Sequence, residues 1–266
     1  MKERIDIILI KRQLVESRVK AQWLIKSGYV LVNGVALKKP GKKVDNKADI
    51  TLKNEFPYVG RGGLKLEAAL NKFSIIIKNK VCVDIGASIG GFTDCLIKNK
   101  ALKVYAIDIA KNILHPSLTS KHNKIIKLLG VDARSLTELD EQVDIVTIDI
   151  TFASLRVILP NVKNYLKISG DIIVLVKPLF ETNFYDKKFF KIITDLQNLK
   201  KILFEFLCWS LENDFFPYGI IQSPILGKGG SIEFLIHFRI DKERKQFKIL
   251  EEIEDVINNI NIKELK

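Results

Sequence analysis

Four ionisable residues stand in settings where an isolated charge would be costly. Asp149 and Lys177 each follow an apolar run, Glu233 stands between apolar neighbours, and Lys65 lies among leucines and alanines. A buried charge is unfavourable unless it is paired, so we expect these four side chains to meet in one cleft. Such a cluster suits removal of a proton from a hydroxyl group, because burial and a neighbouring positive charge favour the neutral lysine that acts as a base.

Each member of this cluster has a predicted role. Lys177 is the candidate base, and Lys65 would supply the neighbouring positive charge. Asp149 and Glu233 would orient the two amines and balance their charge. The alternative is that each charge ends a strand and reaches solvent. The apolar neighbours of Asp149 and Glu233 argue against that alternative.

A second group of residues could bind a nucleoside. The segment Asp84–Gly91 is rich in glycine and follows an apolar strand, and glycines let the backbone approach a ligand. Ser88 stands where the dinucleotide-binding pattern requires glycine, so we expect an adenosine-like ligand without a phosphate. The alternative is a glycine turn that serves only the connection between strand and helix. The predicted ligand contacts are Asp84, Gly86, Ser88, Gly90, Asp108 and Asp132.

Two of these contacts have specific expected partners. Asp108 and Asp132 follow the next two predicted strands of the chain. An acid at the end of the second strand can accept hydrogen bonds from ribose hydroxyls. We expect Asp108 to take that part and Asp132 to reach the adenine edge.

The elements that must position these residues alternate along the chain. With helices between them, we expect strands at residues 81–85, 103–108, 125–129, 144–150 and 171–176. A long helix is expected within 186–211. Two late strands, 216–221 and 231–238, have no helix between them. An amphipathic helix follows residue 241, with Leu250, Ile253 and Ile257 on its apolar face. Apolar strands separated by helices are typical of a parallel sheet covered on both faces. The sequence therefore predicts an α/β fold: a Rossmann-like, mostly parallel sheet with an antiparallel last strand.

The chain is expected to form two domains. Residues 1–54 are rich in basic side chains and predict two short helices followed by small strands around an Asn-Gly turn. We expect a small α+β domain there, a linker at 55–60, and the sheet domain at 61–266.

The basic N-terminal domain is a candidate for binding a polyanion. The formal net charge of the chain is +12, which suits nucleic acid first and an anionic membrane second. For each basic side chain alone, a solvated surface position is the alternative. As a cluster they favour contact with phosphate groups. The predicted contacts are Arg4, Arg12, Arg18, Lys20, Lys38 and Lys39.

Composition argues against several other classes of protein. The 3 cysteines form no CxxC pair and the 3 histidines are scattered, so neither a disulfide framework nor a metal site is expected. No uncharged apolar run reaches the roughly 18 residues that span a membrane, and the start of the chain lacks the pattern of a signal peptide. We therefore expect a cytoplasmic protein without a bound metal and without membrane contact.

Taken together, these motifs resemble the hemolysin-A-type (TlyA) family of ribosomal RNA 2′-O-methyltransferases over nearly the whole chain. The N-terminal domain is similar to the RNA-binding module of small-subunit ribosomal protein S4, through segments such as Val32–Gly34 and Lys39-Pro40. The segments of the second domain that carry the resemblance are Arg61–Leu66, Asp84–Ser88, Gly90–Asp94, Asp149 with Phe152, Leu175–Pro178, Phe180-Glu181 and Ser223–Ile225.

This resemblance implies an activity, a cofactor and a substrate. The family's catalytic Lys-Asp-Lys-Glu tetrad matches Lys65, Asp149, Lys177 and Glu233. The implied reaction transfers a methyl group from S-adenosylmethionine to a ribose 2′-hydroxyl, of a cytidine, in ribosomal RNA. The implied partner is ribosomal RNA, either free or within ribosomal subunits.

Other interpretations stay open. Methylation of an amino group would favour Asn-Pro-Pro-Tyr where Asp149–Phe152 stands, and a cysteine nucleophile would replace Lys177 before Pro178. A ribosome-associated RNA-binding protein without enzymatic activity would explain the basic domain but not the embedded charges of Asp149 and Glu233. A membrane-active hemolysin is suggested by the family's name, and the sequence shows no apolar span that supports it.

Overall fold

The chain folds into two compact units, which are described separately. The computed structural model describes residues 2–15, 18–26, 28–53, 57–121, 123–182, 195–241 and 247–260, and for a few of these, Lys20 among them, only the backbone. The first unit is Met1–Pro57 and the second is Tyr58–Lys266. Residues 58–60, which the sequence suggested as part of a linker, therefore belong to the second unit.

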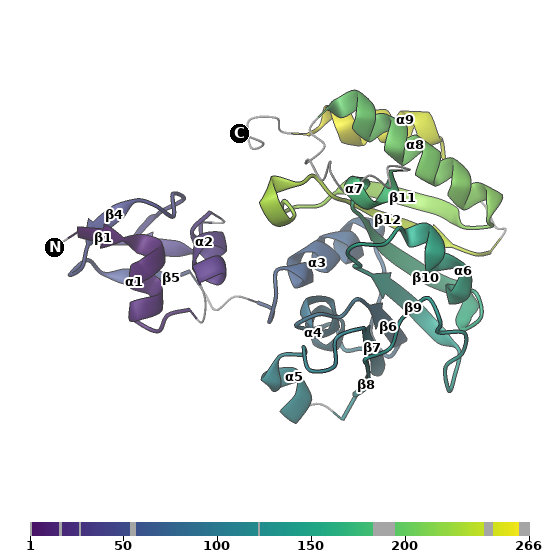
Figure 1. Cartoon of the computed structure of the whole chain (residues 1–266), viewed down its shortest axis with the longest axis horizontal. Coiled ribbons are helices and arrows are strands. Elements are labelled where there is room, and N and C mark those ends of the chain that lie inside the picture. Colours follow the sequence, from purple (N-terminus) through teal and green to yellow (C-terminus); the bar gives the residue numbers. More distant parts are fainter. Residues whose placement is uncertain are drawn as a thin grey trace. The chain divides into compact units, whose positions relative to one another are not determined.

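The first unit is a small α+β domain, as predicted (Figure 1). Its elements are β1 (Lys2–Arg4), α1 (Ile5–Lys11), α2 (Arg18–Lys26), β2 (Val30–Val32), β3 (Val35–Ala36), β4 (Lys43–Asp45) and β5 (Ile50–Leu52). Strand β2 lies between β3 and β5 in an antiparallel sheet, and β1 pairs with β4. The sequence did not predict β1 or β4, because their residues, Lys-Glu-Arg and Lys-Val-Asp, are mostly charged and form no run of strand-forming side chains.

The β2–β3 hairpin of this unit turns at Asn33 and Gly34. Their φ angles are 50° and 77°. Positive φ at both central residues defines the type I′ turn, whose twist matches that of the flanking strands and which the Asn-Gly pair favours. The predicted turn is therefore confirmed.

The second unit is built on a seven-stranded sheet in the order β11-β12-β10-β9-β6-β7-β8. Its strands are β6 (Val81–Ile85), β7 (Lys103–Asp108), β8 (Ile125–Leu129), β9 (Val143–Ile148), β10 (Leu166–Val176), β11 (Phe216–Gln222) and β12 (Phe234–Arg239). Neighbours from β10 to β8 pair in parallel, and β12 runs antiparallel to both β10 and β11. This confirms the α/β fold with a mostly parallel sheet and an antiparallel last strand.

Helices cover this sheet and bury its strands. They are α3 (Gly62–Phe73), α4 (Gly91–Lys98), α5 (Pro116–Lys121), α6 (Leu159–Val162), α7 (Pro178–Glu181), α8 (Leu196–Glu212) and α9 (Ile249–Asn258), with short 3₁₀ turns at Leu155–Val157 and Lys228–Gly230. Helices α3 and α4 pack together, and α8 and α9 pack together beside β11 (Figure 1). Every residue of β6 is buried, as expected for a central parallel strand with both faces covered.

Two predicted catalytic residues lie outside the strands to which the sequence assigned them. Strand β9 ends at Ile148 and β12 begins at Phe234, so Asp149 and Glu233 lie in the adjoining loops. A loop position at the edge of the sheet lets a charged side chain reach the cleft, whereas a position within a strand would aim it at the apolar layer.

The two long C-terminal helices differ in detail from the prediction. Leu250, which was expected on the apolar face of α9, is 64% exposed, whereas Ile253 and Ile257 are buried. Leu250 lies in the first turn of α9, beyond the buried part of that face. The long helix expected within 186–211 is observed from Leu196, and residues 183–194 lie outside the described residues.

Candidate active site

A cavity opens where the strand order of the sheet reverses. From β6 the chain runs outward to β7 and β8 and then returns to the other side of β6 for β9 and β10. In open α/β sheets, ligands bind in the crevice at this point, outside the carboxyl ends of the strands. Here the carboxyl ends of β6, β7 and β9 surround a cavity of about 540 Å³. That volume lies within the roughly 300–1,000 Å³ that is typical of small-molecule sites.

The walls of this cavity are mostly apolar, and acids stand at its edge. Its apolar lining includes Ile107, Ile109, Ile113, Val131 and Ile158. Asp108, the last residue of β7, accepts hydrogen bonds from the backbone N–H groups of Ser88 and Ala110, both at 2.8 Å. These bonds fix both carboxylate oxygens and leave each with a lone pair that could accept a hydroxyl group.

Asp132 also lines the cavity, but its carboxylate forms an ion pair with Arg134. The Arg134 guanidinium lies 2.6 Å from the carboxylate in an exposed ion pair. Hydrogen bonds from the side chain and backbone of Arg134 lower the pKa of Asp132. Asp132 is therefore a charged acceptor at neutral pH, and an exposed pair of this kind contributes little to stability.

The loop after β6 presents its backbone to the cavity. Gly86 has a φ of 81°, and a Cβ atom on it would lie 2.3 Å from the carbonyl oxygen of Asp149. Gly90 has a φ of 97°, and a Cβ atom there would lie 2.2 Å from the side chain of Leu118. Only glycine fits both the positive φ angle and the available space at these two positions. The backbone of the loop can therefore come close to the cavity, as the glycine pattern predicts.

Of the six residues predicted to bind a nucleoside, four line the cavity and two lie behind it. Gly86, Ser88, Asp108 and Asp132 line it. Gly90 packs against α5, and Asp84 has no exposed surface. Burial raises the pKa of Asp84 to about 7. These two residues support the loop rather than face a ligand, because both lie on the side of the loop that packs against the protein core.

A smaller cavity of about 190 Å³ adjoins the first. Gly86, Ser88 and Asp149 line both cavities. Arg61 and Lys65, at the start of α3, line the smaller one. The two cavities therefore share a boundary at Asp149, and the smaller cavity also has two cationic side chains in its lining.

Glycines let the starts of α3 and α4 approach each other beside this smaller cavity. A Cβ atom on Gly91 would lie 3.1 Å from the nitrogen of Gly63 and 3.2 Å from the Cα atom of Gly62. A Cβ atom on Gly63 would lie 2.2 Å from the ring of Tyr58. The positive ends of two helix dipoles thus meet at one place, which favours an anionic group there.

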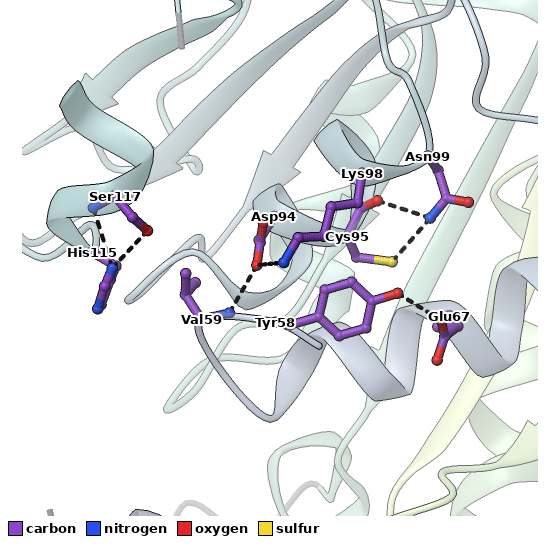
Figure 2. Close-up of polar contacts among 9 residues, drawn as sticks. All are labelled: Tyr58, Val59, Glu67, Asp94, Cys95, Lys98, Asn99, His115 and Ser117. Atoms are coloured by element: carbon purple, nitrogen blue, oxygen red, sulfur yellow. Dashed lines mark hydrogen bonds and ion pairs between the residues drawn. The ribbon is translucent and has the colours of Figure 1, made fainter. Parts of the chain in front are cut away.

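Hydrogen bonds fix the segment that leads into α3, as Figure 2 shows. The Tyr58 hydroxyl donates to Glu67 Oε1 at 2.7 Å, and the Val59 N–H donates to Asp94 Oδ2 at 2.8 Å. Lys98 Nζ donates to the same Asp94 oxygen at 2.9 Å. The segment is thereby tied to both α3 and α4, so that the residues just after it reach the smaller cavity.

The four predicted catalytic residues form two ion pairs. Lys65 Nζ lies 2.5 Å from Glu233 Oε2, and Lys177 Nζ lies 2.5 Å from Asp149 Oδ1. Both pairs are largely buried. Since Lys65 and Asp149 both line the smaller cavity, the two pairs lie around one space. A Cβ atom on Gly227 would lie 2.1 Å from Glu233 Oε1, so a glycine makes room for that carboxylate.

Lys177 is held by more than its ion pair. Its ammonium group also donates to the carbonyl oxygen of Ile150 at 2.8 Å and to Thr151 Oγ1 at 3.0 Å. An ammonium group has three N–H donors, and here each has an acceptor. Lys177 is thereby fixed against the loop that follows β9.

A second link joins this loop to α7. The buried carboxylate of Glu181 accepts hydrogen bonds from Ser154 Oγ at 2.6 Å and from the Leu155 N–H at 2.7 Å, and burial raises its pKa. The ring of Phe180 contacts the ring of Phe152, with ring centroids 5.7 Å apart. Phe152 lines the larger cavity, is 82% exposed and has a φ of 69°. The loop after β9 and helix α7 thus hold the ring of Phe152 at the rim of the cavity.

Two of the basic residues predicted to bind phosphate also hold the first unit together. Arg4 and Arg18 donate to the buried carboxylate of Asp6 at 2.9 Å and 3.1 Å, and Gln22 does so at 3.0 Å. The hydrogen bonds from Arg4, with those from Gln22 and Arg18, hold the pKa of Asp6 far below its usual value. The side chains of Arg4 and Arg18 remain about half exposed. Each of them can therefore bind Asp6 and still present part of its surface to a phosphate group.

The remaining predicted phosphate contacts differ in whether their side chains already bind another group of the protein. Arg12 donates to the backbone carbonyl groups of Asn46 and Ala48, at 2.6 Å and 3.1 Å. Lys38 and Lys39 are exposed and form no ion pair with any residue that the structure describes. The side chain of Lys20 lies outside the described part of the chain. Lys38 and Lys39 are therefore the predicted contacts best placed to meet a phosphate group.

Three residues of the site were not selected as site residues from the sequence. They are Arg61, Phe152 and Glu181. Each lies in a segment that carries the family resemblance, so the signal was present, but residue type alone did not separate them from packing residues. Within the described ranges, no group of histidine, cysteine, aspartate and glutamate side chains is arranged to hold a metal ion. In the same ranges, no helix combines the length and apolar character needed to cross a membrane.

Comparisons with known proteins match both units. The FtsJ-like methyltransferase model matches residues 58–240, and the S4 domain model matches residues 3–50. The 16S/23S rRNA (cytidine-2'-O)-methyltransferase TlyA of Mycobacterium tuberculosis is 31% identical over 91% of this chain and 91% of its own. The 23S rRNA (cytidine-2'-O)-methyltransferase TlyA of Campylobacter jejuni is 34% identical over 88% of this chain and 98% of its own.

A solved structure agrees with these matches along the length of the chain. It is that of a Streptococcus thermophilus protein named as a hemolysin, 32% identical, with a TM-score of 0.73 and coverage of 97% of this chain and 94% of that one. The predicted resemblance is thereby confirmed, and the chain belongs to the FtsJ-like methyltransferase family, among relatives named TlyA, with an S4 domain at its N-terminus.

Proposed function

We propose that this methyltransferase transfers a methyl group from S-adenosylmethionine to the ribose 2′-hydroxyl of a cytidine in ribosomal RNA. The relatives from Mycobacterium tuberculosis and Campylobacter jejuni carry names for this reaction. The observation that carries the proposal is the pairing of Lys65 with Glu233 and of Lys177 with Asp149 around one space beside a nucleoside-sized cavity.

The two adjoining cavities fit the two ends of S-adenosylmethionine. The apolar walls of the larger cavity suit an adenine ring, and Asp108 offers acceptors for ribose hydroxyls. Arg61 and the starts of α3 and α4 suit the carboxylate of the methionine end in the smaller cavity. The bound donor supplies an electrophilic methyl group on a sulfonium ion. Asp149, which lines both cavities, would lie near the point where the two ends join.

The chain's own residues would prepare the ribose hydroxyl for attack. Lys65 donates one N–H to Glu233, and its remaining donors can hold the ribose oxygen. Lys177 would receive the hydroxyl proton after its ammonium group has released one proton to solvent, which frees one of its three contacts. Asp149 keeps Lys177 in place and balances its charge. Proton removal by a positioned side chain of this kind typically contributes about 10²–10⁴-fold to a rate.

The first unit would anchor the RNA while the second modifies it. The exposed Lys38 and Lys39 lie in an S4 domain, which supports contact with phosphate groups of RNA. The partner would be ribosomal RNA, free or within a ribosomal subunit, and the place of action would be the cytoplasm, where ribosomes are assembled.

The test is to map ribose methylation in ribosomal RNA with the purified protein. Ribosomal subunits and free RNA from cells that lack the gene are incubated with the protein and S-adenosylmethionine. We expect a new 2′-O-methyl group at a cytidine. The Lys177→Met variant should lose methyl transfer by about 10²-fold or more, while the shift of thermal unfolding caused by S-adenosylmethionine is kept.

A matched control separates the loss of a site lysine from the loss of a positive charge. Lys72→Met removes an exposed lysine from α3 and should leave activity unchanged. Near-full activity of Lys177→Met would rule out Lys177 as the base. A wild-type protein whose unfolding is not shifted by S-adenosylmethionine, or a methyl group found on a base, would overturn the proposed function.

A further inference from the structure

A carboxyl group is buried behind the glycine loop, outside both cavities. Asp84 has no exposed surface. Its Oδ2 atom lies 2.6 Å from the hydroxyl oxygen of Thr93 in α4, and its Oδ1 atom lies 3.2 Å from that of Thr147 in β9. No lysine or arginine among the described residues forms an ion pair with it. An ionised carboxylate without a cation is strongly unfavourable in such a place.

The hydroxyl group of Thr147 shows which form of the carboxyl group fits. Its oxygen lies 3.2 Å from the carbonyl oxygen of Val83 and 3.2 Å from Asp84 Oδ1. A hydroxyl group has one hydrogen, so an ionised Asp84 and Val83 would compete for it. A neutral Asp84 instead donates to Thr147, which then donates to Val83, while Thr93 donates to the other carboxyl oxygen. In this arrangement each of these polar atoms has a partner.

We propose that Asp84 is held as a neutral carboxylic acid and that in this form it positions the glycine loop and Asp149 for methyl transfer. Thr93 lies in the first turn of α4, whose start lines the smaller cavity, and Thr147 lies two residues before Asp149. One acid therefore links β6, α4 and the end of β9. Its role in catalysis rests on the proposed function, whereas its protonation does not.

Burial and a neighbouring charge both favour the neutral form. Burial raises the pKa of Asp84 to about 7, against the opposing effect of the hydrogen bonds from Thr93 and Thr147. The negative charge of Asp149 adds to this rise. If Asp84 ionised, its negative charge and that of Asp149 would repel each other.

The charged groups on the elements around Asp84 do not supply a compensating positive charge, because Lys98 of α4 pairs with Asp94 and Lys103 of β7 pairs with Glu141. Asp94 of α4 is bonded to Val59 and Lys98, and Asp108 of β7 is bonded to backbone N–H groups on the far side of the loop. Cys82 lies two residues earlier on β6, and burial raises the pKa of its thiol. None of these three groups can carry a positive charge, so none of them would stabilise an ionised Asp84.

This protonation makes a prediction about stability and pH. In the unfolded chain Asp84 would ionise near its usual pKa of 3.8, whereas in the folded chain it keeps its proton up to a pKa of about 7. Between these values the folded state binds more protons than the unfolded state. The contribution of Asp84 to stability is therefore complete below pH 3.8 and falls as the pH rises toward 7. Asparagine at this position removes this dependence, because its amide donates and accepts as the acid does but does not ionise.

The experiment compares the thermal unfolding midpoints of the wild type and Asp84→Asn between about pH 4.5 and pH 8. We expect the midpoint of the variant, relative to the wild type, to increase across this range. A relative midpoint that decreases would show that the folded state needs the charge, and a constant difference would show that Asp84 does not titrate there. Either result would overturn the proposal.

Activity measurements test the positioning role. Asp84→Asn should keep methyl transfer within a few-fold of the wild type, whereas Asp84→Ala, which can make neither hydrogen bond, should lower kcat with little change in the KM for RNA. Equal losses of activity in both variants would contradict the proposal that a neutral Asp84 positions the glycine loop and Asp149. The thermal shift of the wild type by S-adenosylmethionine is measured in parallel. Its absence would overturn the proposed function without altering the result on protonation.

A measurement on the wild type covers the case in which Asp84→Asn does not fold. Aspartate labelled with ¹³C at the carboxyl carbon is followed by NMR through a pH titration. We expect one aspartate carboxyl resonance with a midpoint near pH 7, because burial raises the pKa of Asp84 to about 7. A protein in which every aspartate titrates near or below its usual value would overturn the proposal.

Discussion

At the scale of single residues, Phe152 combines features that a packing role does not explain. Its ring is 82% exposed, and its φ of 69° lies in a region that bulky residues avoid. Such a conformation costs about 1–3 kcal/mol, and an exposed ring gains little burial to offset it. The ring stands at the rim of the larger cavity, with the ring of Phe180 against it. We infer that it offers a flat surface to a base of the RNA substrate.

Replacing Phe152 by leucine tests this stacking surface. The change removes the ring but keeps an apolar side chain, and loss of one stacked base typically costs about 1–3 kcal/mol. We expect the KM for RNA to rise by about tenfold or more, with a small change in the affinity for S-adenosylmethionine. Steady-state kinetics and a binding titration measure the two effects. Phe152→Tyr keeps the ring and should behave as the wild type, and an unchanged KM in the leucine variant would contradict the stacking role.

At the scale of elements, the starts of α3 and α4 must almost touch for the site to form. Helix α3 carries Lys65, and α4 begins at the end of the glycine loop, so the distance between the two helices sets the width of the smaller cavity. The backbone of Gly91 approaches that of Gly62 and Gly63 so closely that a methyl group would lie 3.1–3.2 Å from backbone atoms. Backbone cannot give way as a flexible side chain can, so the contact depends on glycine.

Replacing Gly91 by alanine tests this contact. Within a helix, glycine to alanine normally stabilises by about 0.5–1 kcal/mol. Here we expect the opposite, a loss of about 1–3 kcal/mol in the free energy of unfolding, because overpacking pushes the two helices apart. Urea unfolding measures the change. Gly41→Ala is the control, since its Cβ atom would lie 3.6 Å from the side chain of Arg4, an ordinary contact. Equal effects at the two positions would contradict the steric argument.

At the scale of the whole molecule, the formal net charge of +12 suits a polyanion, and the first unit carries several exposed lysines. Lysines that contact phosphates release counterions, so RNA affinity should fall steeply with salt. We expect Lys38→Ala and Lys39→Ala each to weaken RNA binding and to reduce the slope of log affinity against log salt by about 1. Binding titrations at several salt concentrations measure both. An unchanged slope would rule out phosphate contact at these lysines.

Arg18→Ala should act differently, because Arg18 also holds the buried carboxylate of Asp6. The depressed pKa of Asp6 means that its contribution to stability is present above its usual pKa of 3.8 and is lost as the pH falls below that value. We expect Arg18→Ala to lower the unfolding midpoint of the protein at neutral pH, because it removes one of the hydrogen bonds that favour the ionised form of Asp6. An unchanged midpoint at neutral pH would show that Arg18 serves RNA contact alone.

The sequence determined the elements and the class of fold, because local patterns encode them. Short, mostly apolar segments marked the strands, Asn33-Gly34 marked a hairpin, and the glycines after β6 marked a loop that lines a cavity. Each of these signals depends on neighbours along the chain. The type and order of residues also singled out four charges in apolar surroundings, but they did not single out Arg61, Phe152 or Glu181.

Only the tertiary structure decided which of these residues meet. Lys65 pairs with Glu233, which is 168 residues away in sequence, and Lys177 pairs with Asp149. Asp84 lies behind the glycine loop instead of in the cavity. Which charges pair depends on strand order and on the paths of loops. Strand order and loop paths depend on how the whole chain buries its apolar surface. No local pattern in the sequence encodes that arrangement.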